Sequence, residues 1–311
     1  MYKKDIRLMA FVASAMFWGS GYAADNSIYI DQSGDNSTIT MTQDGSGNKV
    51  KGILLNGTAG GTTDPAKLIG NNQTINIEQT GATNELSLGV NSTVTSGVGV
   101  NLNYQVTDGG NVGFININNN GLGIASNNVV SIVQNGGGAI TTLNMTGTGN
   151  QLSVGQSGGA NNKFIGTINA DSTNVTVSQT LGGGNETTLN MTGDKGIVSV
   201  TTMGATNITN ITQSAYGSAG AQALVNINGS GNQTDITQSG MYDHYASLTV
   251  VGSGNTIDVT QSGGASTGHS ATLLVTGSTN NISLTQQGTV SNLANIKVTG
   301  SSNNYTILQK N

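Results

Sequence analysis

The sequence has no cysteine, one proline and few charged or aromatic residues. Charged side chains are 8% of its 311 residues, whereas a typical soluble domain has roughly 25%. This scarcity is not typical of an ordinary enzyme. Intrinsically disordered chains usually combine high net charge with abundant proline, so the composition does not fit that class either. Hydrophobic residues make up 35% of the chain, which is enough for a core if they are regularly placed.

The first residues have the composition of a targeting segment. Basic residues precede an apolar run from Leu8 to Trp18, and small residues end at Ala23. We expect residues 1–23 to be a secretory signal peptide that is cleaved after Ala23. The apolar run is too short to span a bilayer, and no later stretch is long and apolar enough, so we expect no membrane-spanning segment after cleavage.

Arginine is absent after residue 23. Without residues 1–23 the chain keeps seven lysines and fourteen acidic residues, which gives a net charge of −7. A groove for phosphate or nucleic acid depends on cationic side chains, so we expect no nucleic-acid partner. The lack of arginine also disfavours a carbohydrate lyase, which needs a cleft with cations and carboxylates.

Glutamine, usually followed by a small polar residue and glycine, recurs along the chain. From Gln134 onward most steps between these glutamines are 22 to 25 residues long, with one step of 34. Self-similarity at such a period is typical of stacked-repeat architectures. The clear anchors are Gln32, Gln43, Gln79, Gln134, Gln156, Gln179, Gln213, Gln238, Gln261, Gln286 and Gln309.

Each anchor ends a seven-residue segment of alternating character. Asparagine usually stands six residues before the glutamine, and apolar residues stand four and two residues before it. Period-two alternation predicts a half-buried strand with these residues on its inner face. Stacked inner amides can donate to one neighbour and accept from the other. We expect amide ladders, which also serve polymerisation, at Asn26, Gln32, Ser37, Gln43, Gln79, Asn150, Gln156, Asn232, Gln238, Asn255, Gln261, Asn280, Gln286, Asn303 and Gln309.

A second type of strand ends in glycine. The segment Ala246–Gly252 alternates in this way, and the segments before Gly277 and Gly300 follow the same plan. Because the two types alternate, the sequence predicts an all-β fold, a two-sheet parallel β-solenoid of stacked strand–turn–strand repeats of about 23 residues. Counting half units gives about 11 levels at ~4.8 Å each.

The repeat is not uniform. We expect irregular repeats over residues 24–125, with an insertion at residues 49–70 that holds the only proline, and regular repeats over residues 126–311. An extra strand near residues 197–202 separates Gln179 from Gln213. Either the two sheets exchange roles there or one level has three sides.

These residues resemble the repeat of the curlin family, which forms curli amyloid fibres. The segment Ser37–Gln43 with Gly45 and Asn48 matches the first half of that repeat and its turn. The turn pattern recurs at Gln79–Asn84 and Gln156–Asn161. The chain departs from the family where asparagine replaces the leading serine and where the second strand ends in glycine instead of glutamine.

The resemblance implies a secreted, self-assembling structural subunit of extracellular fibres that serve cell adhesion and the biofilm matrix. It implies export through the periplasm of a Gram-negative bacterium, an outer-membrane secretion pore, a curli-type nucleator and a place on the cell surface. The repeat pattern also reaches Asn26–Gln32 and Asn303–Gln309 without a recognisable polar capping segment. Uncapped ends predict head-to-tail growth into a homopolymer.

We find no catalytic, cofactor-binding or metal-binding pattern in the sequence and expect no enzyme activity. His244 and His269 are expected to be solvated turn residues, since a metal site needs three or four ligands. Asp235 and Asp258 share one outward position, where their repulsion would reduce lateral association.

Two alternatives share the predicted fold. A non-polymerising surface adhesin would differ in having capped ends. An ice-binding solenoid would present a flat outward array of threonine. Thr42, Thr212, Thr237, Thr260 and Thr285 share the position before glutamine, but other repeats carry acidic residues or serine there.

Overall fold

The computed structural model consists of strands and turns, and none of its described residues is helical. The structure describes residues 28, 30–45, 48, 50, 67–70, 72–81, 83–91, 99–107, 111–118, 127–136, 138–159, 161–182, 184–192, 195–204, 206–215, 221–229, 231–240, 244–252, 254–263, 268–288 and 291–310. The predicted signal peptide and Asn26 therefore lie outside the described residues.

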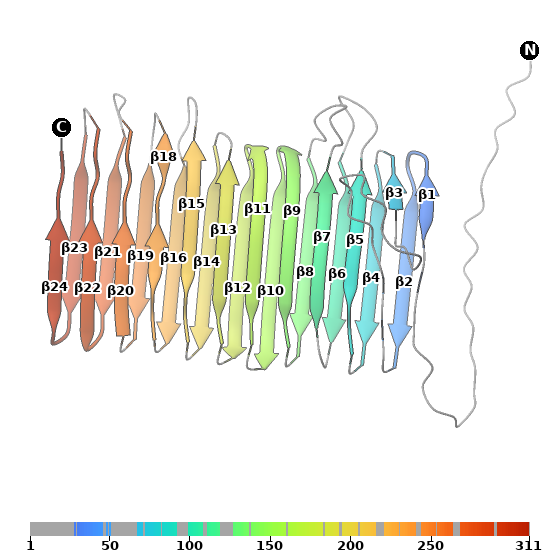
Figure 1. Ribbon diagram of the computed structural model, residues 1–311, viewed down its shortest axis with the longest axis horizontal. Coiled ribbons are helices and arrows are strands. Elements are labelled where there is room, and N and C mark those ends of the chain that lie inside the picture. The colour runs from blue at the N-terminus through green and yellow to red at the C-terminus, as the bar shows by residue number, and fades with distance from the viewer. Residues whose placement is uncertain are drawn as a thin grey trace, which may run out of the picture.

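The strands form two sheets that lie along the same axis (Figure 1). Sheet A contains β1 (Asp31–Ser33), β3 (Lys67–Ile69), β5 (Leu86–Asn91), β7 (Val112–Asn118), β9 (Ile140–Thr148), β11 (Lys163–Asp171), β13 (Glu186–Thr192), β15 (Thr209–Ala215), β17 (Thr234–Ile236), β18 (Ser239–Gly240), β20 (Gly254–Val259), β22 (Thr279–Leu284) and β24 (Asn303–Ile307). Sheet B contains β2 (Thr38–Asp44), β4 (Thr74–Thr80), β6 (Asn101–Thr107), β8 (Val129–Asn135), β10 (Gln151–Gly159), β12 (Asn174–Gly182), β14 (Ile197–Gly204), β16 (Gln222–Gly229), β19 (Tyr245–Val251), β21 (Ser270–Thr276) and β23 (Leu293–Thr299).

The chain alternates between the sheets, and each strand pairs in parallel with the strands of its own sheet one level before and after it. The partners are about one repeat apart, as in the pairing of Leu248 with Leu273. Two short strands, β17 and β18, share one level because both pair with β15. The 13 strands of sheet A thus occupy twelve levels and the 11 strands of sheet B occupy eleven. The predicted parallel β-solenoid is confirmed.

A thin core runs between the sheets. Burial alternates along each strand, so every regular strand has three inward positions and a buried corner residue two places before the first. In β19 the corner is His244 and the inward residues are Ala246, Leu248 and Val250. In-register stacking turns each position into a column of like side chains, which is why β-branched and leucine residues recur at one spacing.

The sheets exchange roles in the middle of the chain. The third inward position holds Gln179 in sheet B, and then Thr202 and Ile227 on the following levels. In sheet A the same position changes from Met191 to Gln213. The extra strand β14 (Ile197–Gly204) causes the exchange, so every level has two sides. This settles the two possibilities that the sequence left open.

Described residues near both ends of the insertion predicted at residues 49–70 belong to one level of sheet A. Val50 bridges both Ile28 on the first level of sheet A and Leu86 on the third. Strand β3 (Lys67–Ile69) pairs with β1 and β5 on the same two levels. The solenoid therefore continues past the insertion without losing register.

Candidate functional site: the amide ladders and the end levels

Glutamine side chains form a hydrogen-bonded ladder inside sheet B. Gln79 Nε2 donates to Gln43 Oε1 at 2.8 Å. Gln156 Nε2 donates to Gln134 Oε1 at 2.8 Å, and Gln179 Nε2 donates to Gln156 Oε1 at 2.9 Å. All five glutamines are at most 5% exposed. The ladder satisfies amides that would be costly to bury alone, and it rewards a single register.

Hydroxyl groups complete this ladder where it stops. Val106 takes the third inward position after Gln79, so the next glutamine is missing. The hydroxyl of Tyr104, on the same strand, donates to Gln79 Oε1 at 3.0 Å instead. At the other end of the ladder, Thr187 Oγ1 donates to Gln179 Oε1 at 2.9 Å. Burial raises the pKa of the Tyr104 phenol, so the group remains a donor at neutral pH.

Replacement of Tyr104 by phenylalanine should destabilise the solenoid. The change keeps the aromatic ring, which packs beside Gly113. It removes the hydroxyl that donates to the buried Gln79 Oε1. An unsatisfied buried acceptor costs about 1–3 kcal/mol. Chemical denaturation of the monomer measures this loss, with Tyr245→Phe on a partly exposed outward position as the control. Equal stability of the Tyr104→Phe variant would show that the hydroxyl does not complete the ladder.

A second glutamine ladder occupies sheet A after the exchange. Gln213, Gln238, Gln261, Gln286 and Gln309 are linked by Nε2–Oε1 distances of 3.0, 2.7, 2.7 and 2.8 Å. Here each Nε2 donates toward the C-terminal end, opposite to the first ladder. Eight repeat anchors follow Gln79 in the sequence. All eight of these glutamines lie in one of the two ladders.

Asparagines form a third ladder along the corner of sheet A. Their Nδ2–Oδ1 distances lie between 2.6 and 3.3 Å. Buried Ala139 interrupts the column between Asn111 and Asn162. The linked residues are Asn48, Asn84 and Asn111, then Asn162, Asn185, Asn207, Asn232 and Asn255, and finally Asn280 with Asn303.

The predicted ladder residues divide between these columns. Asn232, Asn255, Asn280 and Asn303 lie in the corner of sheet A, whereas Asn150 lies in the corner of sheet B, where it accepts from Asn128 Nδ2 at 2.8 Å. The sequence prediction treated them as one set because it took glutamine as the reference, and the glutamines change sheet.

Gln32 and Ser37 differ from the prediction. Gln32 belongs to sheet A, where Leu68 is its register partner, so it has no glutamine neighbour within its own chain. Its Nε2 donates instead to Ser37 Oγ in the following turn. The two residues therefore close the first turn and are not members of a continuous ladder.

Several ladder residues were missing from the predicted set. Asn48 and Asn84 follow Gln43 and Gln79 by five residues, and Asn162 and Asn185 follow Gln156 and Gln179 by six. This second spacing is a signal that could have identified them. The curlin-like match to Asn161 is off by one position, because Asn161 is exposed and Asn162 is buried.

The prediction that His244 and His269 are solvated is wrong. The two side chains are 2% and 1% exposed, and their rings stack with centroids 5.2 Å apart and planes 18° from parallel. They occupy the corner column of sheet B, where Asn128 and Asn150 stand on earlier levels. Among the described residues no group of three or more His, Asp or Glu side chains is placed to hold a metal ion.

The predicted pairing of Asp235 with Asp258 on neighbouring levels of the outer face is confirmed. The pKa of the Asp258 carboxyl is raised above its ordinary value, mainly by burial and secondly by the charge of Asp235. Hydrogen bonds from Ser283 and the Val259 backbone lower this pKa but do not offset the rise. Asp235 Oδ2 accepts from Asn210 Nδ2 at 2.5 Å. Two adjacent carboxylates thus form a negative patch on one face of the rod.

Replacement of Asp258 by asparagine should stabilise the folded chain at pH 7. A carboxyl whose pKa is raised on folding contributes stability below the unfolded pKa, and this stability is lost as the pH rises through the folded pKa. The gain at pH 7 should be less than about 1 kcal/mol, because the side chain is partly solvated. Denaturation midpoints at pH 7 and below about pH 4 test this, since the difference between variant and wild type should vanish at the lower pH. A constant difference at both values would contradict the prediction.

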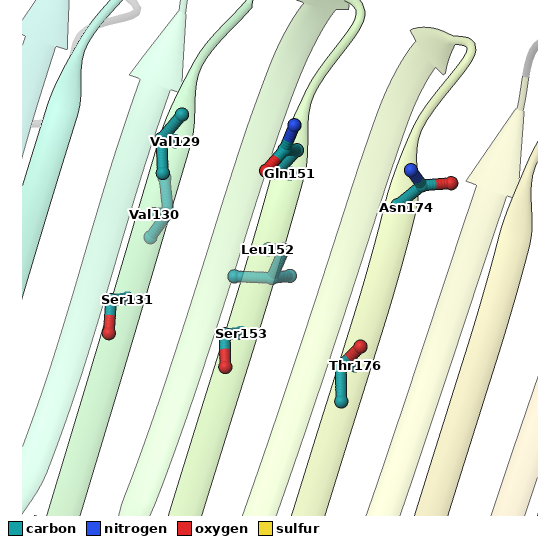
Figure 2. A pocket seen from close by; sticks show the side chains of 8 residues that line it. All are labelled: Val129, Val130, Ser131, Gln151, Leu152, Ser153, Asn174 and Thr176. Atoms are coloured by element: carbon teal, nitrogen blue, oxygen red, sulfur yellow. The ribbon is translucent and has the colours of Figure 1, made fainter.

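The outer face of sheet B has a shallow hollow of about 290 Å³ over β8, β10 and β12. Figure 2 shows Ser131, Ser153 and Thr176 in a row across the three strands, with Val129, Gln151 and Asn174 beside them. The eight lining residues carry hydroxyl, amide and apolar groups and none is ionisable. The hollow follows from small side chains in one column and brings no acid, base or nucleophile pair together.

The last level of the solenoid leaves apolar side chains open to solvent. Tyr305 and Ile307 of β24 are 44% and 48% exposed, whereas Ile282 and Leu284 in the same columns one level earlier are 0% exposed. At the first levels Ile30 and other inward residues are partly buried against the core. In the part of the chain that the structure covers, no helix is long and apolar enough to cross a membrane.

No family model matches the chain, and neither a curated protein nor a solved structure matches it. The fold and the ladders are therefore the ground for any functional proposal.

Proposed function

We propose that the protein is a secreted structural subunit that polymerises end to end into extracellular fibres of the curli type, which serve adhesion and the biofilm matrix. Its activity is the addition of one copy to the end of another. The partner is a second copy of this chain, and the curlin resemblance adds a nucleator and an outer-membrane pore as further partners.

One observation carries the proposal. The inward columns are buried on the level before the last and become nearly half exposed at Tyr305 and Ile307. A parallel strand edge also displays backbone donors and acceptors in register, which natural proteins usually cover or charge. Another level of the same solenoid would bury both the apolar side chains and the edge groups.

The ladders support a specific register for that addition. A strand that slipped by one residue would turn its inward side chains outward, and one that slipped by two would place Gln309 against an apolar side chain. The amide columns would then lose their partners inside a dry core, which is costly. End addition is therefore selective for an in-register copy.

Purified residues 24–311, incubated without denaturant, provide the test. We expect a lag and then filaments that bind thioflavin T, show a 4.7–4.8 Å cross-β spacing and appear unbranched by electron microscopy. Seeds made from sonicated filaments should remove the lag. A chain that is folded by circular dichroism and stays monomeric for days at high concentration, with or without seeds, would exclude this function.

The threonine column gives one observation in favour of an ice-binding solenoid. Thr212, Thr237, Thr260 and Thr285 lie at one outward position on successive levels of sheet A, whereas Thr42 lies on sheet B. The neighbouring column contains Asp235 and Asp258, which breaks a flat hydroxyl array. A folded monomer that fails to form fibres should next be assayed for inhibition of ice recrystallisation and for adhesion to surfaces.

A further inference from the structure

The two sheets do not have the same number of levels. Sheet A begins with β1 and ends with β24, so it has twelve levels, whereas sheet B has eleven. Figure 1 shows β1 and β24 at opposite ends of the stack, with β2 and β23 one step inside them. Each end therefore has a step, with the strand of sheet A protruding and the strand of sheet B recessed.

Two such steps fit together in one way. If sheet A of one copy continued into sheet A of the next, β24 would meet β1 and a complete strand would be missing between β23 and β2. If the next copy is rotated by a half-turn about the long axis, β24 pairs with β2 and β23 pairs with β1. Both columns are then filled without a gap.

We propose, on the basis of the proposed end-to-end assembly, that successive copies in the fibre are related by this half-turn, so that the sheets alternate from copy to copy. Matching the inward positions places Tyr305, Ile307 and Gln309 of one copy beside Ile39, Met41 and Gln43 of the next. The glutamine ladder of one copy then continues into the first ladder of its neighbour. The exchange of sheets in mid-chain makes this possible, because it moves the glutamines from sheet B to sheet A before the end is reached.

Charges at the ends favour the same arrangement. The half-turn brings Lys310 to the register position beside Asp44 of β2. In the unrotated arrangement Lys310 would instead stand beside Ser33 of β1, and no strand would stand next to β23. Exposed ion pairs add little affinity, but pairs of opposite charge steer encounter and fix register.

The side-chain amides respond to the new contact. The Nε2 groups of Gln309 and Gln43 both point toward the junction, because Gln309 Oε1 accepts from Gln286 and Gln43 Oε1 accepts from Gln79. Continuity thus requires one of the two ladders to turn over, either the five amides from Gln213 to Gln309 or the pair Gln43 and Gln79. Turning over the five would give Gln213 Oε1, which is buried with no hydrogen-bond partner, a donor in Gln238, but it would break the bond from Gln213 Nε2 to Gln222 O.

Disulfide formation between single-cysteine variants tests the half-turn, since the chain has no native cysteine. Residues directly opposite in paired strands have Cα atoms within the 4.4–6.8 Å that a disulfide needs. Leu308→Cys mixed with Thr42→Cys should give at least about tenfold more cross-linked dimer in oxidised fibres than Leu308→Cys mixed with Asp31→Cys, whose positions meet without rotation. The soluble monomers should give neither product.

The outcomes separate this inference from the proposed function. Fibres that cross-link mainly through the Leu308–Asp31 pair, or through neither pair, would overturn the half-turn and leave assembly intact. Failure of wild-type and variant chains to form fibres would remove the proposed function, and the half-turn with it.

Charge reversal gives an independent measurement. Lys310→Asp and Asp44→Lys should each slow elongation on wild-type seeds about fivefold at low salt, and the double variant should recover the rate when it grows on its own seeds. Reversal of Lys163 and Glu186, which form a salt bridge of 2.8 Å within one copy, serves as the control. Slowing by the single variants without recovery in the double variant would contradict pairing of these two positions.

Discussion

Replacement of Gly277 by alanine is expected to destabilise the solenoid by about 3 kcal/mol. A Cβ at this position would lie 2.1 Å from Gly252 O and 1.9 Å from Asn255 Oδ1. The first atom belongs to the backbone of the preceding level, and the Gly252 and Gly277 amides both donate to the next level at 2.9 Å, so neither strand end can move away freely. The clash would also disturb the asparagine ladder.

The matched control for Gly277→Ala is Gly155→Ala. Gly155 lies within β10, and the nearest atom to its Cβ would be Ile132 O at 4.0 Å, which is ordinary contact. We expect a change within about 0.5 kcal/mol for this control. Urea or guanidinium denaturation of both soluble variants measures the difference. A similar loss in both would mean that glycine acts through strand propensity and not through the close approach of levels.

Replacement of Ile307 by lysine should slow fibre elongation by about tenfold or more. The monomer of this variant should remain folded. The side chain is 48% exposed in the single chain, so lysine is tolerated there. After a second copy adds, the same position would lie in a dry core, where an unpaired charge is very costly. Seeded elongation followed by thioflavin T and by electron microscopy gives the rate.

Thr306→Lys is the control for Ile307→Lys. It introduces the same charge on the same strand, but at an outward position that stays in solvent after assembly. Equal inhibition by both substitutions would indicate a general charge effect and would contradict burial of the inward column at the fibre end.

The fold was largely predictable because its signal is repeated on every level. Period-two alternation and glycine-rich turns recur along the whole chain, and stacking is the remaining way to bury two-stranded units. The order of the sheets was not predictable between Gln179 and Gln213. A step of 34 residues fits either an extra side or an extra half unit, and the period alone does not distinguish them. In the structure Gly196 stands at the corner before β14, where a Cβ would lie 2.8 Å from both Gln213 Oε1 and Met191 Cε.

The histidines show why the candidate site was only partly predicted. With glutamine as the reference, His244 had no obvious place in the repeat. It stands six residues before Val250, which takes the third inward position of its strand in the half of the chain where sheet B has no inward glutamine. A corner residue therefore stands six positions before the third inward residue of its strand, whatever that residue is. With the exchange of sheets known, this rule predicts that His244 and His269 are buried in one corner column.

The parallel pairing of neighbouring repeats also governs how the chain reaches its fold. Ladder partners are 22 to 27 residues apart on most levels, for example Gln156 and Gln179 at a separation of 23, and 36 residues apart across the insertion. These separations are short, so each level of the described chain costs a modest chain entropy once the level before it exists. A free chain must form its first levels without a template, which is slow, whereas in the proposed assembly a chain that met an existing end would add levels one after another. The structure thus predicts slow nucleation and fast templated growth as consequences of its topology.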